Sequence, residues 1–129
     1  MVQKFSRCVQ FLGGVYDKKE LDALRHFSKA YFHGHSVGGT NPSLLEAMSC
    51  RAFILAHDNP FNKGVLGPDA VYFSDQKELT GHFNLMEDLI SQKSRTFKNG
   101  NFEKIIQYYD WERITRQHED LFGSLLSKV

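Results

Sequence analysis

At 129 residues, the chain has the length of one domain with a single hydrophobic core. Hydrophobic residues make up 41% and charged residues 24%, and no run of about 18 apolar residues occurs, which is typical of a soluble globular chain without a membrane span. The net charge of +1 excludes a strong electrostatic attraction to nucleic acid or to an anionic membrane. Cys8 and Cys50 form no disulfide-framework spacing, so we expect buried thiols in a reducing cytoplasm.

The first predicted elements are a short strand and a helix. Residues 8–12 (CVQFL) are expected to form a strand that Gly13 and Gly14 end. Asp17 with Glu20 three residues later has the pattern of a capping box, which predicts a helix running to about Ser28. The expected buried face of this helix consists of Leu21, Leu24 and Phe27.

The next segment predicts a strand, a glycine-containing turn and a second helix. Residues 30–33 are short, aromatic and uncharged, as expected of a strand that is covered on both faces. Glycines in the following turn let the backbone bend sharply and approach a ligand closely. Asn41 is a good N-cap, and Pro42 occupies the first helical position, where proline is tolerated best. The apolar side chains that share one face of this helix are Leu44, Leu45, Ala47 and Met48.

A helix that begins at the carboxyl end of a strand is a site for an anion, most often a phosphate. Glu46 lies one turn into this helix, and its carboxylate can accept hydrogen bonds from ribose hydroxyls. Two structural alternatives stand beside this interpretation. The turn can be one of the many strand-to-helix turns that bind nothing, and Glu46 can be a surface carboxylate that favours the positive end of the helix.

The second half of the chain predicts two more strands and a helix. Residues 52–56 (AFILA) have the pattern of a buried strand, 57–62 that of a polar loop, and 70–73 that of a fourth short strand. Asp75 and Glu78 repeat the capping-box spacing. The amphipathic helix that follows has its apolar face at Leu79, Phe83, Met86 and Ile90.

The last third of the chain alternates between polar and apolar stretches. Residues 92–101 are polar and basic and are interpreted as a solvated connection or a frayed helix end, with a phosphate-binding tail as the alternative. Residues 102–109 suggest a short helix, and Asp110 is expected to cap the last one. The apolar stripe of that last helix contains Ile114, Leu121, Phe122 and Leu125.

Strands that alternate with helices predict an α/β fold, with a Rossmann-like parallel sheet of about four strands and helices on both faces. Ligands of such sheets bind at the carboxyl ends of the strands. The turns after Leu12, Phe32 and Ala56 are expected to share that edge.

Residues 35–48 (HSVGGTNPSLLEAM) resemble the donor-binding segment of retaining glycosyltransferases of family 4, which have the GT-B fold. The segment is most similar to the rhamnosyltransferase-like branch, which builds capsular and other surface polysaccharides in bacteria. Residues 59–67 and 109–112 extend the similarity. The resemblance implies that residues 1–129 are a single nucleotide-sugar-binding domain, most of a GT-B C-terminal domain, and that the acceptor domain is absent.

The resemblance also implies which residues bind the donor. Gly39, Thr40 and Asn41 would present N–H groups to the distal phosphate, while Glu46 matches the second acidic residue of the family and would contact the ribose. The first acidic residue of the family falls at Gly38, which leaves His35 as the nearest polar candidate for the donor sugar, or a histidine satisfied by a backbone carbonyl. The implied donor-binding residues are Gly14, Val15, Tyr16, His35, Gly38, Gly39, Thr40, Asn41, Glu46 and Asn62.

The implied reaction is hexosyl or rhamnosyl transfer from a dTDP-, UDP- or GDP-linked sugar, without a metal or another cofactor. No catalytic residue is assigned, because the acceptor domain is absent. The turn that supplies an Arg and a Lys to the donor diphosphate in the family also has no counterpart in this sequence. We therefore expect the chain to be inactive alone, cytoplasmic, and peripheral at the inner face of the membrane through the missing partner domain. The alternatives are a non-catalytic nucleotide-binding or dimerisation module and one subunit of a split glycosyltransferase. The expected partners are the nucleotide sugar, the missing acceptor domain or partner chain, and a second copy of the chain in a homodimer.

Overall fold

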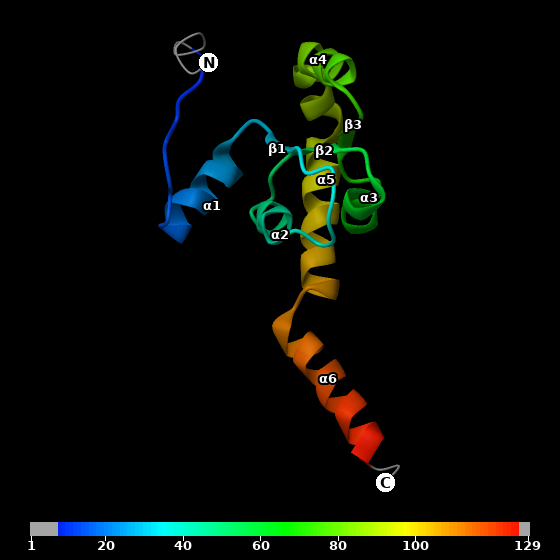
Figure 1. The fold of residues 1–129 in the computed structure, drawn as a ribbon. Helices are drawn as coiled ribbons and strands as arrows, with labels where there is room; N and C mark the ends of the chain where they lie inside the picture. The colour runs from blue at the N-terminus through cyan, green and yellow to red at the C-terminus, as the bar shows by residue number, and fades with distance from the viewer. Residues whose placement is uncertain (1–7, 127–129) are drawn as a thin grey trace.

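The computed structural model describes residues 8–126, which form an α/β fold around a small parallel sheet (Figure 1). The strands are β1 (Tyr31–His33), β2 (Ile54–His57) and β3 (Val71–Phe73). They lie side by side in the order β1-β2-β3, and both pairs are parallel. The predicted strands at 30–33, 52–56 and 70–73 are therefore confirmed, although each begins one or two residues later and β2 ends one residue later than predicted.

Three short helices precede or connect these strands. They are α1 (Lys18–Phe27), α2 (Pro42–Ser49) and α3 (Pro60–Leu66). Asp17 caps α1 and Asn41 caps α2 through their side chains, as predicted. The loop predicted at 57–62 is wrong in part, because Asn59 accepts a hydrogen bond from the backbone N–H of Asn62 and thereby starts α3.

The core consists of two layers, one on each face of the sheet. Ile54 and Ala56 of β2 face α2 and α3, where Leu44, Met48 and Leu66 are buried. Leu55 faces the other side, where it joins a cluster that is closed by α4 and α5. Helices therefore cover both faces, as the alternation of strands and helices predicts.

The second half of the chain is helical after β3. Its helices are α4 (Gln76–Asn84), α5 (Met86–Tyr108) and α6 (Trp111–Leu126), with Asp75 capping α4 and Asp110 accepting from the N–H of Arg113 at the start of α6. The expectation that 92–101 is a connection or frayed end is wrong, since this stretch is the middle of α5. Phe97 packs against the buried ring of Phe53, and Asn101 is fully buried. This side of α5 therefore packs against the rest of the protein, although most residues of the stretch are polar.

The predicted first strand is not formed. Residues 8–12 run as an unpaired segment away from the sheet, and Phe11 and Leu12 are exposed (Figure 1). The sheet consequently has three strands instead of four, and β1 is its edge. Because β1 is an edge strand, Phe32 is 49% exposed and the strand is not covered on both faces as expected. Cys8 is exposed as well, so it is a free but not a buried thiol; Cys50 is free and half-buried.

Helix α1 faces the body with polar side chains instead of the predicted apolar ones. Arg25 is its buried residue, whereas Leu24 and Phe27 are exposed and line an open apolar groove with Leu12 and Val15. The cause is the missing strand at 8–12, which would have supplied the apolar surface for this face of the helix.

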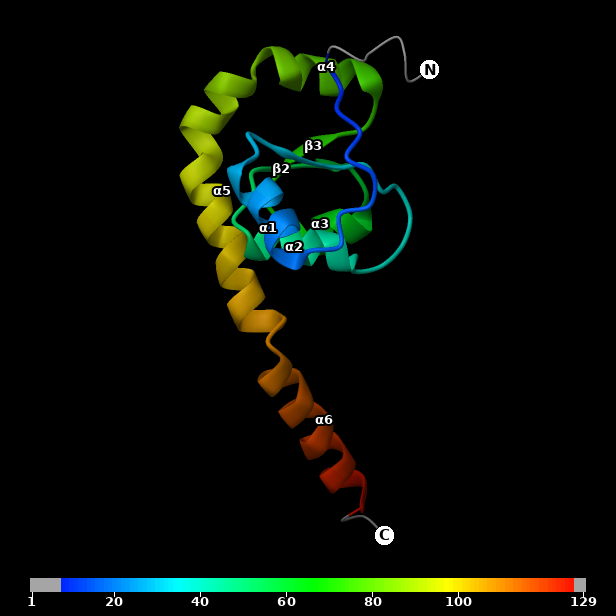
Figure 2. The same cartoon turned by 90° about the vertical axis from the view of Figure 1, so that its left-hand side faces the viewer.

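Helix α6 extends from the end of α5 away from the sheet (Figures 1 and 2), and none of its residues is buried. The predicted apolar stripe is present, but it faces solvent. Its exposed large side chains are Trp111, Leu121, Phe122, Leu125 and Leu126.

A close contact at Gly100 joins α5 to the turn before β3. Lys104 on α5 forms an ion pair with Asp69 and also donates to the carbonyl of Leu66, while the amide of Asn101 donates to the carbonyl of Asp69 at 2.8 Å. The backbone at Gly100 approaches Asp69 so closely that an added Cβ would lie 2.3 Å from its Oδ2 atom. A side chain at residue 100 would displace the Asp69 carboxylate from its ion pair with Lys104.

We therefore expect Gly100→Ala to lower the free energy of unfolding by about 1–3 kcal/mol, the usual cost of forcing an extra methyl group into a packed site. The control is Gly81→Ala in α4, where an added Cβ meets nothing within 4 Å. That change should stabilise the protein by up to about 1 kcal/mol, because alanine is the better helix former. Urea denaturation measures both, and equal stability of the two variants would contradict the contact at Gly100.

Candidate functional site

A small pocket lies at the carboxyl end of β1, where the following loop meets the beginnings of α2 and α3. We call it the α2 pocket. It brings together six residues predicted from the sequence, namely His35, Gly38, Gly39, Thr40, Asn41 and Asn62. The full lining consists of His33, His35, Val37, Gly38, Gly39, Thr40, Asn41, Pro42, Asn59 and Asn62.

The loop between β1 and α2 is shaped by Gly38 and by the cap of α2. Gly38 has φ +116°, a conformation that side chains other than glycine rarely adopt. Asn41 Oδ1 accepts hydrogen bonds from the Ser43 N–H at 3.0 Å and from the Ser43 hydroxyl at 2.7 Å. This cap fixes the start of α2 beside the pocket, where the helix dipole contributes partial positive charge.

Two asparagines from α3 hold the ends of β1 and β2 together beneath this loop. The Asn62 amide donates to the carbonyl of His35 at 3.1 Å and to that of His57 at 2.9 Å. The Asn59 amide also donates to the His35 carbonyl, at 3.0 Å. Asn62, one of the donor-binding residues that the resemblance implies, thus uses its N–H groups inside the protein.

His33 is a site residue that sequence reasoning missed. Its side chain is 1% exposed, and its Nε2 atom is buried without a hydrogen-bond partner. The ring stacks on that of His35, with centroids 4.8 Å apart, because alternate residues of a strand point to the same side. Burial lowers the pKa of His33, and the neighbouring His35 lowers it further. The His-x-His spacing is the signal from which this pair could have been found.

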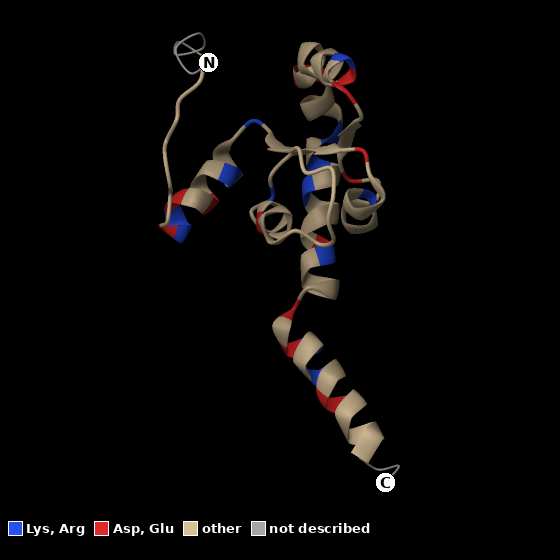
Figure 3. Ribbon diagram, viewed as in Figure 1, with Lys and Arg blue, Asp and Glu red and all other residues tan. Residues whose placement is uncertain are grey.

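The pocket lining contains no lysine, arginine, aspartate or glutamate. Figure 3 shows the loop between β1 and α2 free of such residues, while α1, α5 and α6 carry both signs of charge. The two histidines are therefore the lining side chains that can carry a positive charge.

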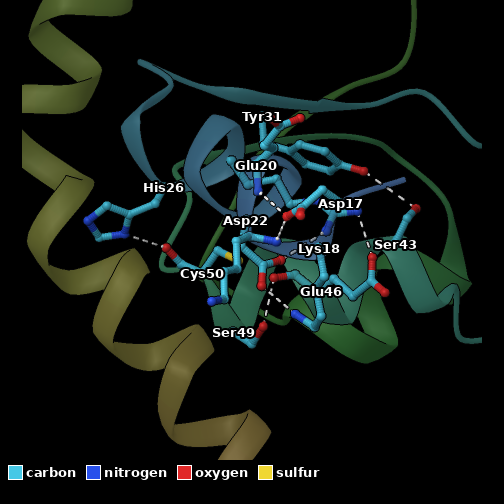
Figure 4. Close-up of polar contacts among 12 residues, drawn as sticks. Asp17, Lys18, Glu20, Asp22, His26, Tyr31, Ser43, Glu46, Ser49 and Cys50 are labelled. Carbon is cyan, nitrogen blue, oxygen red and sulfur yellow. Dashed lines mark hydrogen bonds and ion pairs between the residues drawn. The ribbon is translucent and has the colours of Figure 1, made fainter. Parts of the chain in front are cut away.

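Glu46 lies outside this lining, on the side of α2 that faces α1. Its Oε2 atom is 2.6 Å from Nη2 of Arg25, whose side chain is 8% exposed, while Glu46 itself is 45% exposed. Figure 4 shows this contact region, in which Asp22 also approaches Arg25, at 3.4 Å. Glu46 thus neutralises a buried guanidinium group, a structural role that its position in the sequence did not reveal.

The joint between α1 and α2 continues to the end of α2. His26 Nδ1 lies 2.8 Å from the carbonyl oxygen of Cys50 (Figure 4). Burial raises the pKa of the Cys50 thiol, and its hydrogen bond with Asp22 adds to this effect. The contact between α1 and α2 therefore consists of polar interactions, and no apolar interface holds these two helices together in this region of the described chain.

Three of the implied donor-binding residues are not brought to the α2 pocket. Gly14, Val15 and Tyr16 lie on the segment before α1, where the side chain of Tyr16 is 96% exposed and Val15 lines the apolar groove along α1.

Within residues 8–126, no three histidine, cysteine, aspartate or glutamate side chains are placed to share a metal ion. In the same part of the chain, no helix has the length and apolar character needed to span a membrane.

Comparisons with known proteins give no match: no protein-family model, no curated protein and no solved structure matches the chain significantly.

The asparagine pair gives a direct test of how the pocket is held. Asn62→Asp replaces a buried donor with a carboxylate that faces two carbonyl oxygens, so we expect the free energy of unfolding to fall by about 3 kcal/mol or more. The control is Asn99→Asp, because Asn99 acts as an acceptor, 2.7 Å from Nη1 of Arg51. Chemical denaturation should show little loss of stability for Asn99→Asp. An equally small loss of stability for Asn62→Asp would contradict the hydrogen bonds from Asn62 to the His35 and His57 carbonyls.

Proposed function

We propose that the chain is the donor-binding part of a glycosyltransferase and that the α2 pocket binds the diphosphate of a nucleotide sugar. The observation that carries this proposal is the buried His33 with an unpartnered Nε2 atom at a pocket formed by a glycine-containing loop and the start of a helix. Helix starts bind phosphate with their free N–H groups and positive dipole end. The resemblance of residues 35–48 to the donor-binding segment of family 4 supports the same ligand.

In this proposal the distal phosphate occupies the α2 pocket and the nucleoside extends along the first turn of α2 toward α1. Glu46 lies one turn after Pro42 on that path. Its Oε1 atom accepts a hydrogen bond from a ribose hydroxyl, while its Oε2 atom stays in the ion pair with Arg25. The base then lies toward the segment before α1, where the exposed ring of Tyr16 is available for stacking.

The chemistry of this half of the enzyme is stabilisation of the leaving group. As the acceptor hydroxyl attacks the anomeric carbon, negative charge develops on the departing phosphate, and the start of α2 stabilises that charge. The acceptor and any group that orients it belong to a partner domain. The chain alone is therefore expected to bind the donor and to transfer no sugar.

Calorimetric titration tests the proposal directly. UDP, dTDP and GDP are titrated into the protein beside uridine, thymidine and guanosine. At least one nucleoside diphosphate should bind, and its nucleoside should bind at least about tenfold more weakly, which corresponds to the loss of about 1.4 kcal/mol from the phosphate contacts. Absence of binding by all three diphosphates would overturn the proposal.

Glu46→Gln tests the path of the nucleoside. The change keeps an acceptor but removes the charge that strengthens a hydrogen bond to ribose, so affinity for the nucleotide should fall about tenfold. Stability should fall as well, because the buried Arg25 loses the charge of a partner whose own exposure screens the pair only in part. The control is Glu78→Gln, since Glu78 accepts from the Ser74 N–H at 2.8 Å and belongs to the cap of α4. Unchanged affinity in Glu46→Gln would remove Glu46 from the site.

A second candidate function, self-association of the chain, is favoured by the exposed apolar side of α6. The side chains at spacings of three and four residues form a coiled-coil seam of Trp111, Ile114, His118, Leu121 and Leu125. The charged residues of the helix, Glu112, Arg113, Arg116, Glu119 and Asp120, all lie off this seam. Exposed apolar area of this kind promotes association, and a second copy of α6 presents the same uncharged seam.

We expect Leu121→Glu to shift the protein toward monomer and to raise the dimer dissociation constant at least about tenfold, because a carboxylate would be buried in the seam. The matched control is Gly123→Glu, which adds the same charge on the opposite side of α6, in open space. Sedimentation equilibrium distinguishes the two variants. A wild-type protein that stays monomeric at high concentration would exclude self-association through α6.

A further inference from the structure

We infer that His33 binds the phosphate directly and takes up a proton when it does, so that the α2 pocket binds a dianionic phosphoryl group in a proton-linked way. This inference rests on the proposed function and adds the group that balances the charge of the ligand. The proton comes from the solvent, and no covalent bond is formed or broken.

The first support is geometric. His33 is 1% exposed and lines the pocket with the loop residues Gly38 and Gly39 and the cap residue Asn41. Its Nε2 atom has no partner within the described part of the chain. A buried polar nitrogen without a hydrogen bond is costly and rare in folded proteins. An oxygen of a bound phosphate would accept a hydrogen bond from this Nε2 atom, and the phosphate would also lie at the start of α2.

The second support is the charge of the surroundings. His33 stacks on Tyr31 of its own strand, whose ring centroid is 6.2 Å away, and on His35 of the loop that follows. The lining residues that come from α2 and α3 are uncharged, and Asp58, just before Asn59, is paired with Lys63 at 2.7 Å. His57 on β2 packs against Phe73, on the opposite face of the sheet. A dianion in this pocket would therefore find full positive charge only through protonation of a histidine.

The effect of pH follows from linkage. In the free protein, burial and His35 lower the pKa of His33, so the imidazole is neutral near neutral pH. A dianion beside it favours the imidazolium form and raises the pKa in the complex. Between the two pKa values, affinity should rise by up to about tenfold for each pH unit of acidification, which is the slope for one proton taken up.

The experiment is calorimetric titration with sulfate and with UDP between about pH 6 and pH 8, each in two buffers of different ionisation enthalpy. Sulfate stays a dianion throughout, whereas the terminal phosphate of UDP takes up its own proton near about pH 6. For the wild type we expect uptake of close to one proton with sulfate and tighter binding at lower pH. His33→Asn should bind at least about tenfold more weakly without proton uptake. His82→Asn, on α4 and outside the pocket lining, is the matched control and should bind sulfate with the affinity and proton uptake of the wild type.

The outcomes separate this inference from the proposed function. Binding of UDP without proton uptake, with the same affinity in His33→Asn, overturns the role of His33 and leaves the proposed function standing. No binding of either sulfate or UDP by the wild type overturns both. If His33→Asn does not fold, NMR titration of the His33 ring in the wild type decides: its pKa should rise when sulfate is added, and an unchanged pKa contradicts the inference.

Discussion

The α2 pocket depends on the hydrogen bonds by which Asn59 and Asn62 hold the carbonyl groups of His35 and His57. The strands are only three or four residues long, so their ladders alone cannot fix the loops that follow them. Buried carbonyl groups at strand ends need donors, and the amides at the start of α3 supply these donors. With the His35 carbonyl fixed, the loop that carries Gly38 turns toward Asn41, which caps α2 and lines the pocket. The hydrogen bonds that hold the strand ends together thus also hold the pocket in shape.

The rest of the molecule divides into a closed part and an open part. The closed part is the sheet with α2, α3, α4 and α5, which the contact of Gly100 with Asp69 locks at one end. The open part consists of the segment before α1 and the exposed helix α6 (Figure 2). It also includes the apolar groove along α1. Two amphipathic helices that expose apolar side chains are expected to meet further apolar surface. This division agrees with the proposal that the chain provides one half of a site and associates with a partner.

Local rules of sequence predicted the parts of the fold that depend on neighbouring residues. Side-chain caps need only a short polar residue and the following turn, and the predicted ones at Asp17, Asn41, Asp75 and Asp110 are all present. The predictions of a strand at 8–12 and of a helix that ends near 92 were wrong, because strand pairing and packing between residues far apart in the sequence decide both features. In the site, the loop residues were predicted, whereas the burial of His33 and the ion pair between Glu46 and Arg25 depend on tertiary contacts.

A phosphate site at the start of α2 is tested most directly by mapping backbone amide shifts by NMR during titration with UDP. We expect the largest shifts on the amides of Gly38, Gly39, Thr40 and Asn41, the loop that lines the pocket. Shifts confined to the groove along α1 or to α6, with the amides of this loop unchanged at saturation, would contradict it.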